Sequence, residues 1–122
     1  MKSSLTDLPI KADTSQRISR VTEWGGMVIY AGEIHQDHDL TPSLTGSPDE
    51  RCQCPHWGYV LKGQIRFDIA GQEEEFNEGD LFYVPPEHLV LSETAGSQYI
   101  ILMPADEWKK EEDKRTRQDL GE

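Results

Sequence analysis

Two cysteines and a histidine alternate in the segment Cys-Gln-Cys-Pro-His, at Cys52, Cys54 and His56. Successive side chains of an extended backbone point to opposite faces, so these three would share one face of a strand. Two thiols and an imidazole on one face can hold zinc or another borderline metal ion. The alternative is a pair of reduced, buried cysteines without a metal, since free cysteine is among the most buried residue types.

The composition limits the classes of partner. The chain has 122 residues, the size of one domain with a single core. It carries 23 acidic and 12 basic residues, for a formal net charge of -11. This balance speaks against nucleic acid or an anionic membrane as a partner, because both require a basic surface.

The cellular location is inferred from the N-terminus, the apolar runs and the cysteines. No apolar run approaches the roughly 20 residues needed to cross a bilayer. The N-terminal residues lack the apolar core of a secretory signal. Two cysteines one residue apart cannot form a relaxed disulfide, so we expect reduced thiols and a cytoplasmic protein.

Between residues 18 and 104, short apolar runs alternate with turns that contain glycine. The segment from Gln64 to Ile69 alternates polar and apolar residues, which indicates a half-buried strand. Strands are expected at 57–61, 64–69, 73–76, 81–84, 89–93 and 98–103, and on either side of Gly25 and Gly26. This spacing predicts an all-β domain at 18–104, an antiparallel sandwich or barrel.

The two ends of the chain differ from this β domain. Residues 1–17 are polar and contain Pro9, so we expect an N-terminal arm or an edge strand there. Residues 105–122 are rich in helix formers, which predicts a short C-terminal helical tail. Trp108 is the only large apolar residue of this tail before Leu120. We therefore expect an appended helix, anchored by Trp108, that takes no part in a site.

The segment that ends in Tyr-Val-Leu-Lys-Gly resembles a motif of the cupin superfamily, specifically of small single-domain cupins. That motif typically reads His-x-His, three or four residues, Glu, six residues, Gly. If Gly63 is its final glycine, His56 takes the place of the glutamate. Cys52 then takes the place of the second histidine, and Glu50 that of the first.

A second stretch resembles the other cupin motif, which typically reads Gly, five residues, Pro-x-Gly, two residues, His. The segment from Gly79 to Pro85 matches its first half. Glu87 occupies the glycine position and Val90 the histidine position, while His88 lies two residues early. The positions that usually bind metal in cupins thus carry other residues, so a conventional site of histidines and a glutamate is not expected.

The resemblance implies a fold and an altered site. The fold is the cupin-type double-stranded β-helix, a jelly-roll barrel with the short helix appended. His88 and Val90 have the same parity on a strand, so His88 can point into the barrel. The altered site would then consist of Cys52, Cys54, His56 and His88, with Glu50 as a reserve ligand or as a hydrogen-bond partner of an imidazole. These ligands suit a divalent metal, zinc first and iron or copper next, and disfavour magnesium, calcium and manganese.

Two further histidines, His35 and His38, are spaced three residues apart. In an extended segment this spacing places them on opposite faces. We interpret them as solvated loop residues.

Small barrels of this size enclose one small-molecule cavity. We therefore expect a small-molecule-binding cupin with a divalent metal site in the barrel. A metal-free binding or regulatory module is one alternative. A metal-dependent cupin enzyme is another, for which the resemblance implies dioxygenase, isomerase or lyase chemistry, with catalytic residues left open. The resemblance also implies a homodimer, in which the arm at 1–17 could be exchanged.

Overall fold

The structure of the chain, a computed structural model, describes residues 1–41 and 51–119, with side chains up to residue 114. The described strands form two antiparallel sheets. The larger sheet has the order β1-β2-β3-β10-β5-β8 and consists of β1 (Ile10–Asp13), β2 (Arg17–Trp24), β3 (Met27–Ile34), β10 (Gln98–Pro104), β5 (His56–Lys62) and β8 (Leu81–Val84). The smaller sheet has the order β4-β9-β6-β7 and consists of β4 (His38–Asp39), β9 (His88–Glu93), β6 (Gln64–Ile69) and β7 (Gln72–Asn77).

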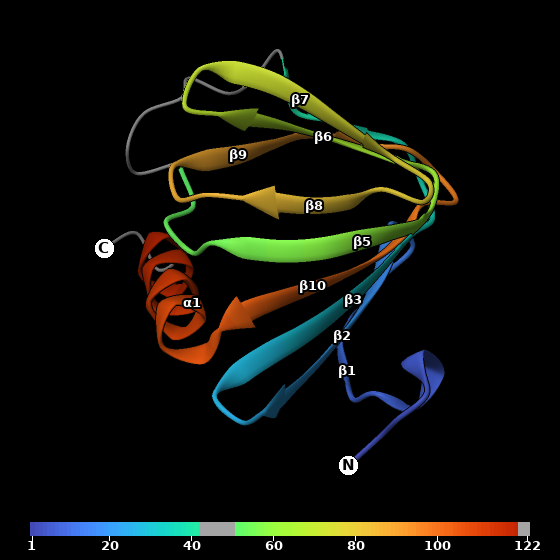
Figure 1. Ribbon diagram of the computed structural model, residues 1–122, viewed down its shortest axis with the longest axis vertical. Helices are drawn as coiled ribbons and strands as arrows, with labels where there is room; N and C mark the ends of the chain where they lie inside the picture. The colour runs from blue at the N-terminus through green and yellow to red at the C-terminus, as the bar shows by residue number, and fades with distance from the viewer. Residues whose placement is uncertain (42–50, 120–122) are drawn as a thin grey trace.

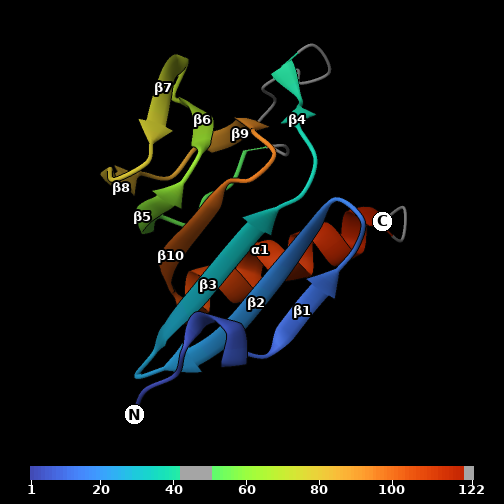
Figure 2. The ribbon, with the colours of Figure 1, turned by 90° about the vertical axis from the view of Figure 1, so that its right-hand side faces the viewer.

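Two helical segments accompany the sheets. A short 3-10 turn, η1 (Leu5–Asp7), precedes β1, and α1 (Ala105–Asp119) directly follows β10. The helix lies at the end of the barrel where β10 ends and β5 begins (Figure 1). A view turned by 90° shows β1, β2 and β3 as one side of the molecule, with β6, β7 and β9 on the other (Figure 2). Two antiparallel sheets with one C-terminal helix are the architecture that the sequence predicts.

The alternation seen in the sequence of β6 is explained by its burial. Ile65 and Phe67 point inward and are each 2% exposed, while Gln64 and Arg66 are only half-buried. The turn before this strand needs a glycine, because Gly63 has a φ of +80° and a Cβ there would lie 2.1 Å from Ser97 Oγ. The strand boundaries are therefore set both by the alternation and by turns that only small residues can make.

An aromatic cluster fills the space between β6, β7 and β8. The rings of Phe76 and Phe82 are stacked with centroids 4.5 Å apart, and Phe67 packs against both. Gly58 on β5 faces this cluster, and a Cβ added there would lie 2.2 Å from Phe82 Cζ. The absence of a side chain at Gly58 is therefore what allows the Phe82 ring to occupy its position.

The N-terminal segment is an edge strand, one of the two alternatives that the sequence left open. Within it, β1 pairs antiparallel with β2 of the same chain. Pro9 O accepts a further hydrogen bond from Val21 N at 2.9 Å. Residues from Pro9 onward thus extend the larger sheet of their own subunit.

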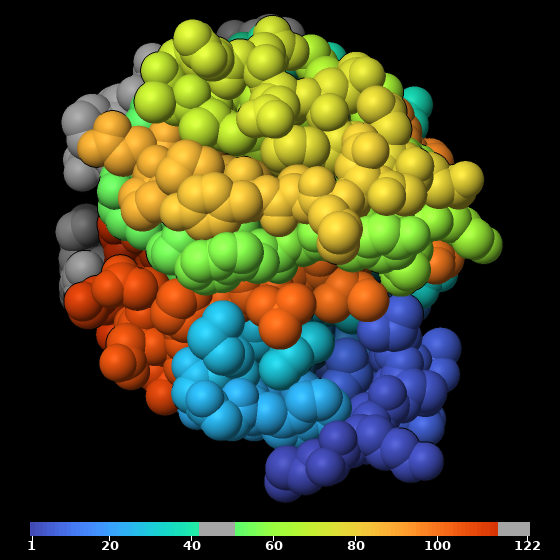
Figure 3. All heavy atoms as spheres, viewed as in Figure 1, coloured from blue at the N-terminus to red at the C-terminus, as the bar shows by residue number. Residues whose placement is uncertain are grey.

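The outer face of the larger sheet carries two rows of apolar side chains. Cross-strand partners on β3, β10, β5 and β8 align to form them. One row consists of Ile29, Leu102, Trp57 and Tyr83, and the other of Ala31, Ile100, Tyr59 and Leu81. Leu81 is 81% exposed and Tyr83 50%, and β8, β5 and β10 lie open side by side on the face shown in Figure 3. An antiparallel sheet normally presents polar residues to water, so this surface, called the apolar face below, differs from an ordinary solvated one.

The helix α1 packs on the barrel through few apolar residues. Ala105 is 4% exposed, and Trp108 is partly buried against the core. Trp108 is thus an anchor, as the sequence suggested. The described helices include none that is long and apolar enough to cross a membrane.

We predict that Gly58→Ala lowers the free energy of unfolding by about 1–3 kcal/mol, because the new methyl group overpacks the aromatic cluster. Urea denaturation followed by tryptophan fluorescence measures the loss. The double variant Gly58→Ala/Phe82→Leu should lose less stability than the sum of the two single variants, since the smaller side chain makes room for the methyl group. Additive losses would contradict the packing role given to Gly58.

Candidate metal centre

Three of the side chains singled out in the sequence meet in space. One ligand atom from each of Cys52, His56 and His88 lies within 4.8 Å of the other two. Donors to one zinc ion lie about 2.0–2.3 Å from it, so small side-chain rotations would bring these three atoms onto a single ion. His88 is buried, and Cys52 and His56 are half-buried. The group therefore has the size and chemistry of a metal site.

Backbone hydrogen bonds bring Cys52 and His88 together although they are far apart in the sequence. Cys52 N donates to His88 O at 2.8 Å, and Cys52 O accepts from Glu87 N at 2.8 Å. Glu87 has a φ of +72°, a left-handed conformation at the position where the cupin motif has glycine. The turn before β9 thus keeps the backbone conformation of that motif without its glycine.

One hydrogen bond fixes the tautomer of His88. Its Nδ1 lies 2.7 Å from Pro85 O, and a carbonyl oxygen can only accept. Nδ1 therefore carries the proton of the neutral ring, and Nε2 presents its lone pair. Metal-binding histidines commonly donate their second ring N–H to a carbonyl in this way. The ring also packs edge-on against His56, with centroids 4.4 Å apart.

Cys54 does not belong to this group, although it lines the same cavity as Cys52 and His56. The segment before β5 bends at Cys54, so the regular alternation that would place all three side chains on one face does not hold. Cys54 is 0% exposed, belongs to the apolar core, and its Sγ lies 3.6 Å from Pro55 O. Glu50, the reserve ligand, lies outside the described residues. The structure thus groups three of the four expected ligands and places the fourth among core side chains.

A cavity of about 340 Å³ adjoins the group and extends between the two sheets. Cys52 and His56 line it together with apolar side chains from both sheets. These apolar residues are Ile65, Phe67, Val90, Ile101 and Met103. Val90, where the cupin motif has its histidine, thus contributes a hydrocarbon surface to the cavity. A volume of this size suits a small molecule.

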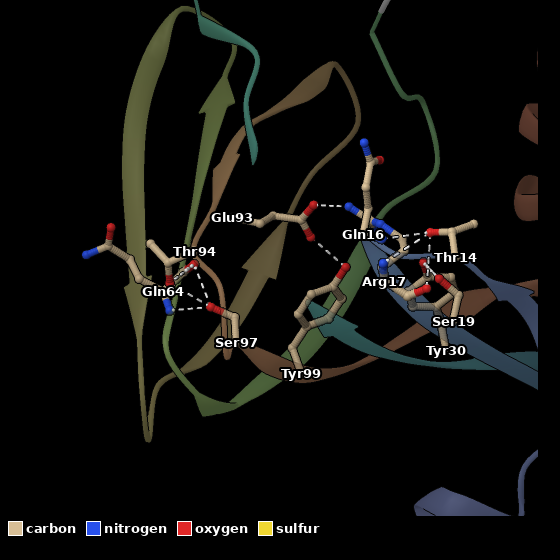
Figure 4. A network of polar contacts seen from close by, with 10 residues as sticks. All are labelled: Thr14, Gln16, Arg17, Ser19, Tyr30, Gln64, Glu93, Thr94, Ser97 and Tyr99. Carbon is tan, nitrogen blue, oxygen red and sulfur yellow. Dashed lines mark hydrogen bonds and ion pairs between the residues drawn. The ribbon is translucent and has the colours of Figure 1, made fainter. Parts of the chain in front are cut away.

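A polar network forms another part of the cavity wall (Figure 4). Glu93 is 3% exposed, forms an ion pair with Arg17 and accepts a hydrogen bond from Tyr99 Oη at 2.7 Å. Burial raises the pKa of Tyr99, and the negative charge of Glu93 raises it further. Burial lowers the pKa of Arg17, but the interactions with Glu93, Tyr99 and Tyr30 together outweigh this effect and the net shift is upward. Tyr99 therefore stays a hydrogen-bond donor and Arg17 a cation at neutral pH.

The helix α1 also takes part in the cavity, contrary to the expectation that it belongs to no site. Trp108, Glu111 and Glu112 line the cavity from the helix, and Lys11 lines it from β1. Lys11 Nζ lies 3.2 Å from Glu112 Oε2 and 5.9 Å from the centroid of the Trp108 ring. These contacts join β1 to α1 beside the cavity.

Some of these residues could have been recognised in the sequence and others could not. Trp108 and Glu111 are three residues apart, so they share a helix face, and an acid on the buried face was the available signal. His38, which we interpreted as solvated, lines the cavity from β4. Arg17 and Glu93 are 76 positions apart, so no local sequence pattern could indicate that they form a pair.

The comparisons with known proteins concern the fold. A family model described as a cupin domain matches residues 43–96. No curated protein matches the sequence. Several solved structures match most of the chain. An RmlC-like cupin from Shewanella frigidimarina NCIMB 400 has a TM-score of 0.56 and 16% sequence identity over 84% of this chain and 89% of that one.

Two further solved structures carry functional descriptions. A putative mannose-6-phosphate isomerase from Ralstonia eutropha JMP134 has a TM-score of 0.57 and 20% identity over 85% of this chain and 98% of that one. A nucleoside dehydratase has a TM-score of 0.57 and 13% identity over 85% of this chain and 82% of that one. Structures of variants of a Streptomyces protein with a similar fold contain uridine. Likeness at these identities concerns the fold alone, and together with the cupin-domain model that matches residues 43–96 it confirms the predicted cupin-type barrel and the resemblance to the cupin superfamily.

Proposed function

We propose that the protein binds a divalent metal ion through Cys52, His56 and His88 and a small molecule in the adjoining cavity. The observation that carries this proposal is the convergence of one sulfur and two imidazole nitrogens within 4.8 Å, with Cys52 and His56 on the cavity wall. The tautomer of His88, with Nε2 presenting its lone pair, supports it. Three protein ligands leave a coordination position for the small molecule.

Zinc is the ion that this set of ligands favours most. A thiolate with two imidazoles suits zinc, and with a change of redox state iron or copper. A fourth protein ligand, Glu50 or Cys54, would instead close the coordination sphere and turn the ion into a structural one. The spacing of the two cysteines, too close for a relaxed disulfide, supports the proposed cytoplasmic location.

A metal-dependent enzyme is the second candidate. The isomerase and dehydratase descriptions of proteins with the same fold support small molecules as ligands and leave the reaction open. A bound ion would supply Lewis-acid chemistry toward an oxygen of such a molecule. Around the cavity, the side chains of Phe67, Ile101 and Met103 would exclude water. The network of Arg17, Glu93 and Tyr99 would offer hydrogen bonds to the small molecule.

We predict that protein purified without an affinity tag and loaded with zinc retains one equivalent of the metal. Cys52→Ser and His88→Gln should each lower the affinity for zinc at least 10-fold, because each removes a ligand. Affinity should also fall with decreasing pH, because protons compete for the thiolate and the imidazoles. Elemental analysis gives the stoichiometry, and competition with a chromophoric chelator gives the affinity.

Cys54→Ala is the matched control for this experiment. It removes the other thiol and should leave stoichiometry and affinity unchanged, since Cys54 lies outside the group of three ligand atoms. A loss of affinity equal to that of Cys52→Ser would instead establish Cys54 as a ligand. Wild-type protein that folds normally and retains no metal would support the metal-free binding or regulatory module.

We further propose a homodimer in which two copies pack through the apolar face. The eight side chains in its two rows carry no charge, so they can be covered by a second copy despite a net charge of -11 on each chain. Aromatic residues such as Trp57 and Tyr83 are typical of the centre of protein interfaces. A two-fold axis would place the same patch on both partners.

We predict that Leu81→Glu dissociates this dimer, because it places a charge within the apolar face. Sedimentation equilibrium should show at least a 10-fold higher dissociation constant than for the wild type. Ile10→Glu on β1 introduces the same charge at a side chain that is 54% exposed, outside the apolar face, and should have no effect. If Ile10→Glu dissociates the dimer and Leu81→Glu does not, the chains associate through the N-terminal strand instead.

A further inference from the structure

We propose that Glu111 is a positioning residue of the metal centre, which holds the backbone on either side of Cys52 from the helix α1. This inference rests on the proposed metal site. It assigns a role to a residue 58 positions after Gln53, its hydrogen-bond partner in the cysteine segment. It also gives α1, which we expected to take no part in a site, a role beside the proposed metal site.

Glu111 contacts the residue between the two cysteines. Its Oε1 accepts a hydrogen bond from Gln53 N at 3.0 Å, and the residue is only 6% exposed. Its Oε2 lies 2.8 Å from Lys114 Nζ, which donates to Arg51 O at 3.0 Å. One carboxylate and one ammonium group of α1 therefore hold the peptide groups before and after Cys52.

The other side of this segment is held by the turn before β9. Cys52 exchanges backbone hydrogen bonds with His88 and Glu87. Arg51 Nη1 donates to Glu87 O at 2.9 Å and to Asp68 Oδ1 at 3.0 Å. The backbone that carries the cysteine thus lies between β9, which carries His88, and α1, which carries Glu111. Loss of the helix contacts would remove the hydrogen bonds that hold this backbone from the side of α1.

The position and the charge of Glu111 both indicate that it orients the backbone and does not bind the metal ion itself. The hydrogen bonds of Glu111 go to backbone N–H and to Lys114, so its carboxylate acts on the conformation of the chain. Lys114 balances its negative charge, so the pair adds no net charge beside a Cys52 thiolate. Groups that orient metal ligands through hydrogen bonds typically change metal affinity 10- to 100-fold when they are removed.

We test this role with Glu111→Ala, which removes both contacts, and Glu111→Gln, which keeps an oxygen to accept from Gln53 N. Glu111→Ala should weaken zinc binding 10- to 100-fold in chelator competition. In the cobalt-substituted protein, it should also alter the thiolate-to-cobalt charge-transfer absorption that reports on Cys52. Glu111→Gln should restore most of the affinity. Glu107→Ala is the matched control, because Glu107 pairs with Lys110 on the same helix and is half-exposed.

The outcomes separate this inference from the proposal on which it rests. Wild-type protein that binds neither zinc nor cobalt would overturn the metal site itself. Wild-type binding with unchanged affinity and cobalt spectrum in Glu111→Ala would overturn the positioning role alone, even if the melting temperature falls. If Glu111→Ala does not fold, Lys114→Met replaces it, since this variant removes the contact to Arg51 O and should also weaken zinc binding while Glu107→Ala does not.

Discussion

The site depends on the antiparallel pairing of the Cys52 backbone with the first residue of β9. Two peptide hydrogen bonds of 2.8 Å bring a thiol and an imidazole from segments 36 residues apart to the same wall of the barrel. The left-handed conformation of Glu87 makes the turn that permits this pairing. Backbone hydrogen bonds between antiparallel segments set which residues lie directly opposite each other. The grouping of Cys52, His56 and His88 is therefore largely a consequence of the barrel topology.

Besides Cys52 and His56, the cavity wall contains a second polar feature, the ion pair of Arg17 with Glu93. His88 and Glu93 begin and end β9, so they lie about 17 Å apart along the strand. Glu93 on β9 and Arg17 on β2 link the smaller sheet to the larger one. A buried ion pair contributes little to stability once the loss of hydration is counted. Its place on the cavity wall fits recognition of a polar group at the far end of a small molecule.

The sequence predicted much of the fold because its signals are local. The alternation in β6 and the glycine-containing turns depend on neighbouring residues and correctly indicated the strands. The same alternation would have placed Cys54 beside Cys52, but the bend before Pro55 interrupts the strand and Cys54 joins the core. Contacts of Glu111 with Gln53 and of Arg17 with Glu93 join distant segments, so only the folded chain reveals them. The role of Glu50 remains a prediction, because it lies outside the described residues.

X-ray absorption at the zinc edge tests the central claim most directly, because it counts the sulfur and nitrogen neighbours of the bound ion. The account predicts one sulfur at about 2.3 Å and two imidazole nitrogens at about 2.0–2.1 Å in the zinc-loaded protein. It also predicts that the sulfur is lost in Cys52→Ser and retained in Cys54→Ala. A zinc ion surrounded only by nitrogen and oxygen in the wild-type protein would contradict the account.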